Sequence, residues 1–75
     1  NQLLKSILSC CDKLIVNYQK QLTSILDLIK LYDSDIHIPM ERKLDGRFLH
    51  ELANVTATLM EAINDYRFKV KKKLS

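Results

Sequence analysis

The sequence predicts an all-α fold, a long antiparallel helical hairpin that associates into a four-helix bundle or a coiled-coil-like oligomer. Apolar residues recur at alternating steps of four and three from residue 3 to residue 32 without a break, which is typical of a helix packed lengthwise on another helix. A similar pattern fills the second half of the chain. Glycine and proline occur once each, so the chain has few places to turn.

The first helix is predicted over residues 2–33. Three further apolar residues, Ile7, Leu14 and Leu28, lie beside its stripe, and Leu26 widens it on the other side. Three apolar positions per heptad are typical of a helix that touches two neighbours in a bundle. The stripe itself consists of Leu4, Leu8, Cys11, Ile15, Tyr18, Leu22, Ile25, Ile29 and Tyr32.

A turn is predicted at about residues 34–38. Asp33, Ser34 and Asp35 favour helix ends and turns because their side chains compete for backbone hydrogen bonds. Pro39 suits the first turn of a following helix, where its missing N–H costs nothing. So short a connection predicts antiparallel neighbours, and residues whose numbers sum to about 72 would then face each other.

The second helix is predicted over residues 39–72. Gly46 is its weak point, since glycine costs about 1 kcal/mol relative to alanine inside a helix. A shorter helix from residue 47, capped by Asp45, is the alternative. Its main stripe is expected to be Leu44, Phe48, Leu52, Val55, Leu59, Ala62, Ile63, Tyr66 and Val70, and the residues expected to widen that stripe are Leu49, Ala53 and Met60.

Both apolar stripes are too wide to be covered by one neighbouring helix. A second copy would cover the remainder, and twofold dimers are the commonest closed assembly. We therefore expect a homodimer, with a higher oligomer or a heteromeric bundle with another helical protein as alternatives. The residues expected at the oligomer interface are Leu4, Ile7, Leu8, Cys11, Leu14, Ile15, Tyr18, Leu22, Ile25, Leu28, Ile29, Phe48, Leu49, Leu52, Val55, Leu59, Met60, Ile63 and Tyr66.

No residue pattern indicates catalysis, a metal site or a cofactor. The two cysteines, Cys10 and Cys11, are adjacent, and neither they nor His37 and His50 have the spacing of a zinc site. Phosphate-binding loops and nucleophile elbows are absent from the sequence. We therefore expect a protein that is not an enzyme.

Residues 67–75 form a basic end that carries five of the twelve lysines and arginines and no acid. Cations suit the C-terminal end of a helix because they interact favourably with its dipole. The same charges predict weak, salt-sensitive contact with nucleic acid or anionic lipid as an alternative role. The residues concerned are Arg67, Lys69, Lys71, Lys72 and Lys73.

The function expected from these patterns is self-association. No apolar run reaches the roughly 18–20 residues of a membrane span, and unpaired cysteines favour an intracellular location in the cytoplasm or nucleus. We expect residues 1–75 to be one helical oligomerisation domain, a fragment of a larger protein that works without catalysis. A nucleic-acid-binding module and a heteromeric scaffold subunit are the alternatives. Many unrelated proteins share this pattern, and no motif in it indicates one family.

Overall fold

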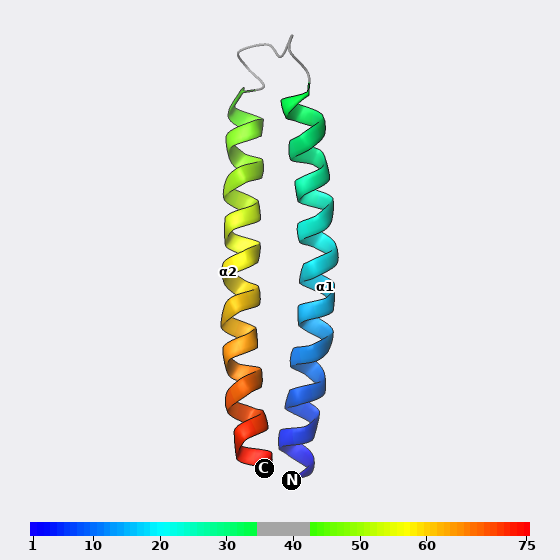
Figure 1. The fold of residues 1–75 in the computed structure, drawn as a ribbon, viewed down its shortest axis with the longest axis vertical. Helices are drawn as coiled ribbons and strands as arrows, with labels where there is room; N and C mark the ends of the chain where they lie inside the picture. Colours follow the sequence, from blue (N-terminus) through cyan, green and yellow to red (C-terminus); the bar gives the residue numbers. More distant parts are fainter. Residues whose placement is uncertain (35–42) are drawn as a thin grey trace.

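The chain folds into two long antiparallel helices, as the sequence predicts. The computed structural model describes residues 1–34 and 43–75, and the backbone alone for residues 43–45. Helix α1 covers Gln2–Asp33 and helix α2 covers Lys43–Leu74. Both termini lie at one end of the rod, here called the open end (Figure 1). The opposite end, where α1 ends and α2 begins, is called the closed end. The predicted turn and the predicted start of the second helix lie outside the described residues.

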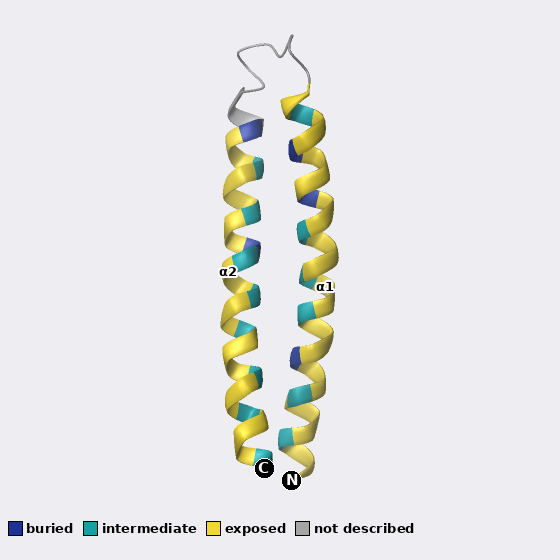
Figure 2. Ribbon diagram, in the orientation of Figure 1, coloured by how far each residue is buried: buried dark blue, intermediate teal, exposed yellow. Residues whose placement is uncertain are grey.

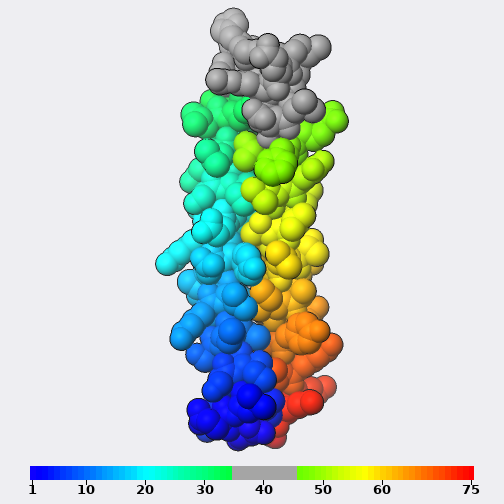
Figure 3. Space-filling model, turned by 180° about the vertical axis from the view of Figure 1, so that it is seen from behind, coloured from blue at the N-terminus to red at the C-terminus, as the bar shows by residue number. Residues whose placement is uncertain are grey.

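The hairpin is much more elongated than a compact protein of its length. It measures 56 × 14 × 14 Å, and its radius of gyration is 17.0 Å. A compact chain of this length has a radius of gyration of about 11 Å. Side chains of the two helices meet along the described length of the rod (Figure 3). Each helix therefore has one intramolecular neighbour, which covers only one of its sides.

Local hydrogen bonds define both ends of α1. The Asn1 side-chain oxygen accepts from the backbone N–H groups of Leu3 and Leu4, at 2.9 and 3.4 Å. Asparagine is a preferred N-cap because it satisfies N–H groups that have no partner inside the helix. At the other end the Ser34 N–H donates to the Lys30 carbonyl at 3.0 Å. The Ser34 hydroxyl donates to the Leu31 carbonyl at 2.8 Å. The predicted helix limits of 2 and 33 are thus confirmed.

The stripe predicted on the first helix is confirmed as the side of α1 that faces α2. Cys11, Ile25 and Ile29 are buried, and the other six members of the stripe are half-buried. These residues lie along the edge of α1 that faces α2 in Figure 2. We call this set, from Leu4 to Tyr32, the inner seam of α1.

The side of α2 that faces α1 differs from the main stripe that the sequence predicts. Phe48, Leu52, Val55, Leu59 and Tyr66, which belong to the predicted main stripe, are all exposed and do not face α1. Apart from Ala57, the buried and half-buried positions again recur at steps of three and four. This inner seam of α2 is Gly46, Leu49, Ala53, Thr56, Met60, Ile63, Arg67, Val70 and Leu74.

Small side chains explain why this weaker stripe faces α1. Gly46, Ala53 and Thr56 occupy the half of the inner seam of α2 that is nearer the closed end. They leave room for the bulky residues of α1, and a close approach of two helices improves their packing. The buried Thr56 hydroxyl donates to the Leu52 carbonyl in its own helix at 2.8 Å, so it remains hydrogen-bonded inside the interface.

Gly46 is a packing position and does not break the helix. Helix α2 runs through it from Lys43, so the predicted alternative of a helix starting at residue 47 is wrong. A Cβ atom at Gly46 would overlap the aromatic ring of Tyr32. The Tyr32 hydroxyl is buried and has no hydrogen-bond partner among the described residues.

Two contacts fix the register of the hairpin. The Tyr32 ring lies on Gly46, and Asp12 forms an ion pair with Arg67. The residue numbers in these two contacts sum to 78 and 79. Because the two stripes repeat with the same heptad period, residues that face each other elsewhere along the rod also have numbers that sum to about 78. The predicted sum of 72 is wrong by about six residues. As a result Cys11 lies level with Arg67, whereas the predicted register places it level with Glu61.

Candidate functional site: the unpartnered outer face

The hairpin has too small a core for a protein of its size. Among the described residues only Cys11, Ile25 and Ile29 are buried apolar residues, and no side chain is fully enclosed. The accessible surface is 6157 Å² for a chain of 8.8 kDa. A compact protein of that mass exposes about 4,800 Å², so the hairpin exposes about 1,400 Å² more. Part of this excess is concentrated on two apolar stripes.

The first exposed stripe belongs to α2 and lies one residue before its inner seam. Its large apolar side chains are between 38% and 65% exposed. Its residues recur at the same alternating steps of four and three as those of the inner seam. They therefore lie along one line on the helix surface, as residues at a helix–helix contact do. This outer seam of α2 is Phe48, Leu52, Val55, Leu59, Ala62 and Tyr66, followed by Lys69 and Lys73.

The second exposed stripe belongs to α1 and also lies one residue before the inner seam. Its leucines and isoleucine are between 37% and 69% exposed. They gather toward the two ends of the helix, whereas exposed polar residues occupy the middle. This outer seam of α1 is Leu3, Ile7, Cys10, Leu14, Asn17, Gln21, Ser24, Leu28 and Leu31.

Both outer seams lie on the same face of the hairpin. A step back of one residue rotates the side-chain direction by about 100° around a right-handed helix. The two helices face each other and run in opposite directions, so the same step turns both seams toward one side. We call this side, made by the two outer seams, the outer face.

The opposite side of the hairpin is polar. One residue after each inner seam, α1 carries side chains such as Lys5, Asp12 and Lys30, and α2 carries side chains such as Asn54 and Glu61. We call this side the polar face. Its exposed large apolar residues are Val16, Leu26 and Phe68. A contrast of this kind between two faces is expected when one of them packs against another chain, since contiguous apolar patches mark interaction sites.

The structure divides the predicted interface residues into two groups. Those on the outer face are Ile7, Leu14, Leu28, Phe48, Leu52, Val55, Leu59 and Tyr66. Those on the inner seams are Leu4, Leu8, Cys11, Ile15, Tyr18, Leu22, Ile25, Ile29, Leu49, Met60 and Ile63. Leu3 and Leu31 also lie on the outer face and were missed. Their spacing could have identified them in the sequence. Leu3 lies four residues before Ile7 and Leu31 lies three residues after Leu28, which continues the alternating steps of the stripe.

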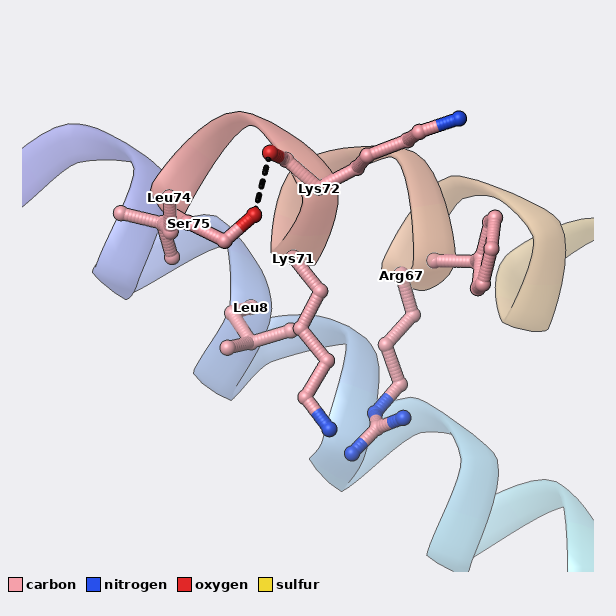
Figure 4. A pocket seen from close by; sticks show the side chains of 7 residues that line it. Leu8, Arg67, Lys71, Lys72, Leu74 and Ser75 are labelled. Atoms are coloured by element: carbon pink, nitrogen blue, oxygen red, sulfur yellow. Dashed lines mark hydrogen bonds between the residues drawn. The ribbon is translucent and has the colours of Figure 1, made fainter.

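The basic end is less uniform than its sequence indicates. Arg67 belongs to the inner seam of α2, is half-buried and forms an ion pair with Asp12 of α1. In Figure 4 its side chain and that of Lys71 extend over α1, whereas the Lys72 side chain points away from α1. Lys69 lies over the Tyr66 ring, with its Nζ atom 5.6 Å from the ring centre. A shallow groove at the open end is lined by Leu8, Arg67, Phe68, Lys71, Lys72, Leu74 and Ser75.

Within residues 1–34 and 43–75, no histidines, cysteines, aspartates or glutamates gather in a group of three or more that would suit a metal ion. Neither described helix contains a stretch long and apolar enough to span a membrane. Both cysteines are free, Cys10 on the surface and Cys11 in the inner seam. Comparison of the chain with protein-family models, curated proteins and solved structures finds no match.

Proposed function

We propose that this chain is a non-catalytic self-association module, which sets the copy number of the protein that carries it. The observation that supports the proposal is the outer face, where two parallel stripes of apolar side chains are exposed to water on one side of the hairpin. Two such faces, placed against each other, make a four-helix bundle in which every helix has two apolar neighbours. We further propose that the module works inside the cell, where Cys10 and Cys11 remain reduced.

The exposed surface is large enough for a stable dimer. A standard protein–protein interface buries about 800 Å² on each partner. The hairpin exposes about 1,400 Å² more than a compact chain of equal mass, so an interface of that size is within reach. A second copy is favoured as the partner because the same face of both copies then forms the interface about a twofold axis. Such a dimer is closed and needs no second binding surface.

A pair of matched substitutions tests the proposal. Leu59→Asp places a charge on the outer face, and Leu26→Asp places the same charge on the polar face. The two leucines have nearly equal exposure, 42% and 44%. Size-exclusion chromatography with light scattering should show a monomer for Leu59→Asp and a dimer for Leu26→Asp. If both variants remain dimers, the outer face is not the interface.

A partner of a different sequence gives a distinct result. The unmodified chain would then be monomeric or poorly folded alone, and both leucine variants would behave like it. Recovery of a cooperative melting transition on addition of a second protein would then replace self-association by a heteromeric bundle.

Phosphate contact at the open end is a second candidate, which rests on the exposed Lys71, Lys72 and Lys73 in the last turn of α2. Pairing of Arg67 with Asp12 leaves fewer free charges than the sequence indicates. The expected binding is weak and falls steeply with salt, because it depends on counterion release. A fluorescence anisotropy titration with duplex DNA or RNA at low salt tests it. Binding that survives replacement of the three lysines by glutamine would contradict it.

A further inference from the structure

The two outer seams carry information on how the second copy is oriented. Two twofold arrangements bring the outer faces together. If the axis runs along the rod, the two open ends coincide and α1 of one copy packs on α2 of the other. If the axis crosses the rod, the open ends lie at opposite ends, α1 packs on α1 and α2 packs on α2. All neighbouring helices are antiparallel in both arrangements, so helix dipoles do not discriminate between them.

The polar residues of α1 favour the axis that crosses the rod. Asn17, Gln21 and Ser24 lie level with Val55 and Leu59 of α2, given the register of the hairpin. With the axis along the rod, they would pack on Val55 and Leu59 of the other copy. Burying amide groups against apolar side chains leaves them without partners and is unfavourable.

Two of these residues, Asn17 and Ser24, no longer pack on Val55 and Leu59 when the axis crosses the rod, whereas Gln21 faces an apolar side chain in both arrangements. The middle of α1 then packs on the middle of α1 from the second copy, so Asn17 meets Asn17. Gln21 meets Leu14 near Asn17 of the other copy, and Ser24 meets Cys10. Amide groups that pair across a helical interface also fix its register, which is a well-attested role for asparagine in coiled coils.

The apolar ends of the seams match in this arrangement as well. Ile7 faces Leu28 and Leu3 faces Leu31 of the second copy, because the axis passes near the middle of a helix that runs from residue 2 to residue 33. The basic positions of α2 do not discriminate between the two arrangements, since Lys69 and Lys73 would lie against apolar side chains of the other copy in both, near Ile7 and Leu3 or near Leu52 and Phe48.

The charges of the rod favour the same orientation independently. The open end carries Lys69, Lys71, Lys72 and Lys73 on α2, and α1 has no acid there before Asp12. Among the residues whose side chains are described, the closed end carries the exposed acids Asp27, Asp33 and Glu51 and the bases Lys30 and Arg47. An axis along the rod brings two basic ends together, whereas an axis across the rod places each basic end beside the acids of its partner. Salt screens this contribution, with a Debye length of about 8 Å at physiological ionic strength.

We propose that a second copy of this chain packs on the outer face with its open end at the opposite end of the rod, about a twofold axis that crosses the rod near Asn17. The inference rests on the proposed self-association. It makes Asn17 and Ser24 the residues that set the orientation of the dimer, and the leucines and isoleucine beside them the residues that stabilise it.

Distance measurement between spin labels tests the orientation. A single label is attached to Ser75→Cys in a background of Cys10→Ser and Cys11→Ala, and circular dichroism confirms that the helices remain. Ser75 lies level with residue 3 of α1, 14 residues from the axis at Asn17, so the two labels should lie about 28 residues, or about 42 Å, apart along the rod. A distance of about 20 Å would show that the open ends coincide and would overturn the proposal. Two populated distances would overturn it too.

Disulfide trapping gives a second test that keeps the native cysteines. In Ser24→Cys, the new thiol meets Cys10 of the second copy, and mild oxidation should produce a covalent dimer. Within one chain these positions are about 21 Å apart along α1 and cannot bond. Thr23→Cys, on the polar face, is the control and should remain monomeric on a denaturing gel. If the unlabelled protein sediments as a monomer, the proposed function fails. A dimer with the wrong label distance removes the orientation alone.

Discussion

Replacement of Leu59 by alanine should weaken the dimer measurably while leaving the hairpin helical. Full burial of a leucine side chain stabilises by about 1.5–3 kcal/mol. Leu59 is 42% exposed in the hairpin, so covering it contributes about 0.6–1.3 kcal/mol per copy. Both copies lose this contact in a symmetric dimer, and the dissociation constant should rise about 7- to 70-fold.

Sedimentation equilibrium over a range of concentrations measures that change, and Leu26→Ala is its control. Leu26 is 44% exposed but lies on the polar face, and leucine and alanine are both good helix formers. Its replacement should leave the dissociation constant within experimental error of the unmodified chain. Equal weakening by the two substitutions would refute the assignment of the outer face, because it would show a general loss of stability.

The remaining predictions concern the contact between the two helices. Gly46→Ala should lower the urea midpoint because the added methyl group overlaps the Tyr32 ring, although alanine is the better helix former by about 1 kcal/mol. In a Tyr32→Ala background the ring is absent, and Gly46→Ala should no longer lower the midpoint. Thr56→Val should change the free energy of unfolding by less than about 1 kcal/mol, since the lost hydroxyl bonds only within its own helix, and a larger loss in thermal melting would contradict this. Asp12→Asn should cost up to about 1 kcal/mol at low salt and less at high salt, because the ion pair with Arg67 is partly exposed.

The inner seam of α1 could be predicted from the sequence residue by residue. Its nine positions carry apolar or aromatic side chains without interruption, whereas the outer seam of the same helix is interrupted by Asn17, Gln21 and Ser24. Hydrophobicity and spacing therefore agree on which side of α1 faces its neighbour. The two helices themselves were predictable for the same reason, since a heptad pattern of this length has no strand alternative.

The inner seam of α2 could not be predicted from hydrophobicity alone. This helix carries two stripes one residue apart, and the more apolar one, with Phe48 and Leu59, faces away from α1. Packing against α1 determines which of the two stripes faces it. Gly46 leaves room for the ring of Tyr32, whereas a bulky side chain at that position would overlap the ring. The register between the two helices could not be predicted from the sequence either. A pattern that repeats every seven residues fits several registers, and it does not give the length of the connection that would select one of them. That register in turn places Arg67 beside Asp12.

The molecular mass of the unmodified chain in solution tests the central claim most directly. Sedimentation equilibrium at micromolar concentration should give twice the chain mass of 8.8 kDa. The dimer should melt cooperatively, and its midpoint should rise with protein concentration. A particle of 8.8 kDa that melts cooperatively, at a midpoint independent of concentration, would show that the hairpin is stable with its outer face in water and would contradict the account.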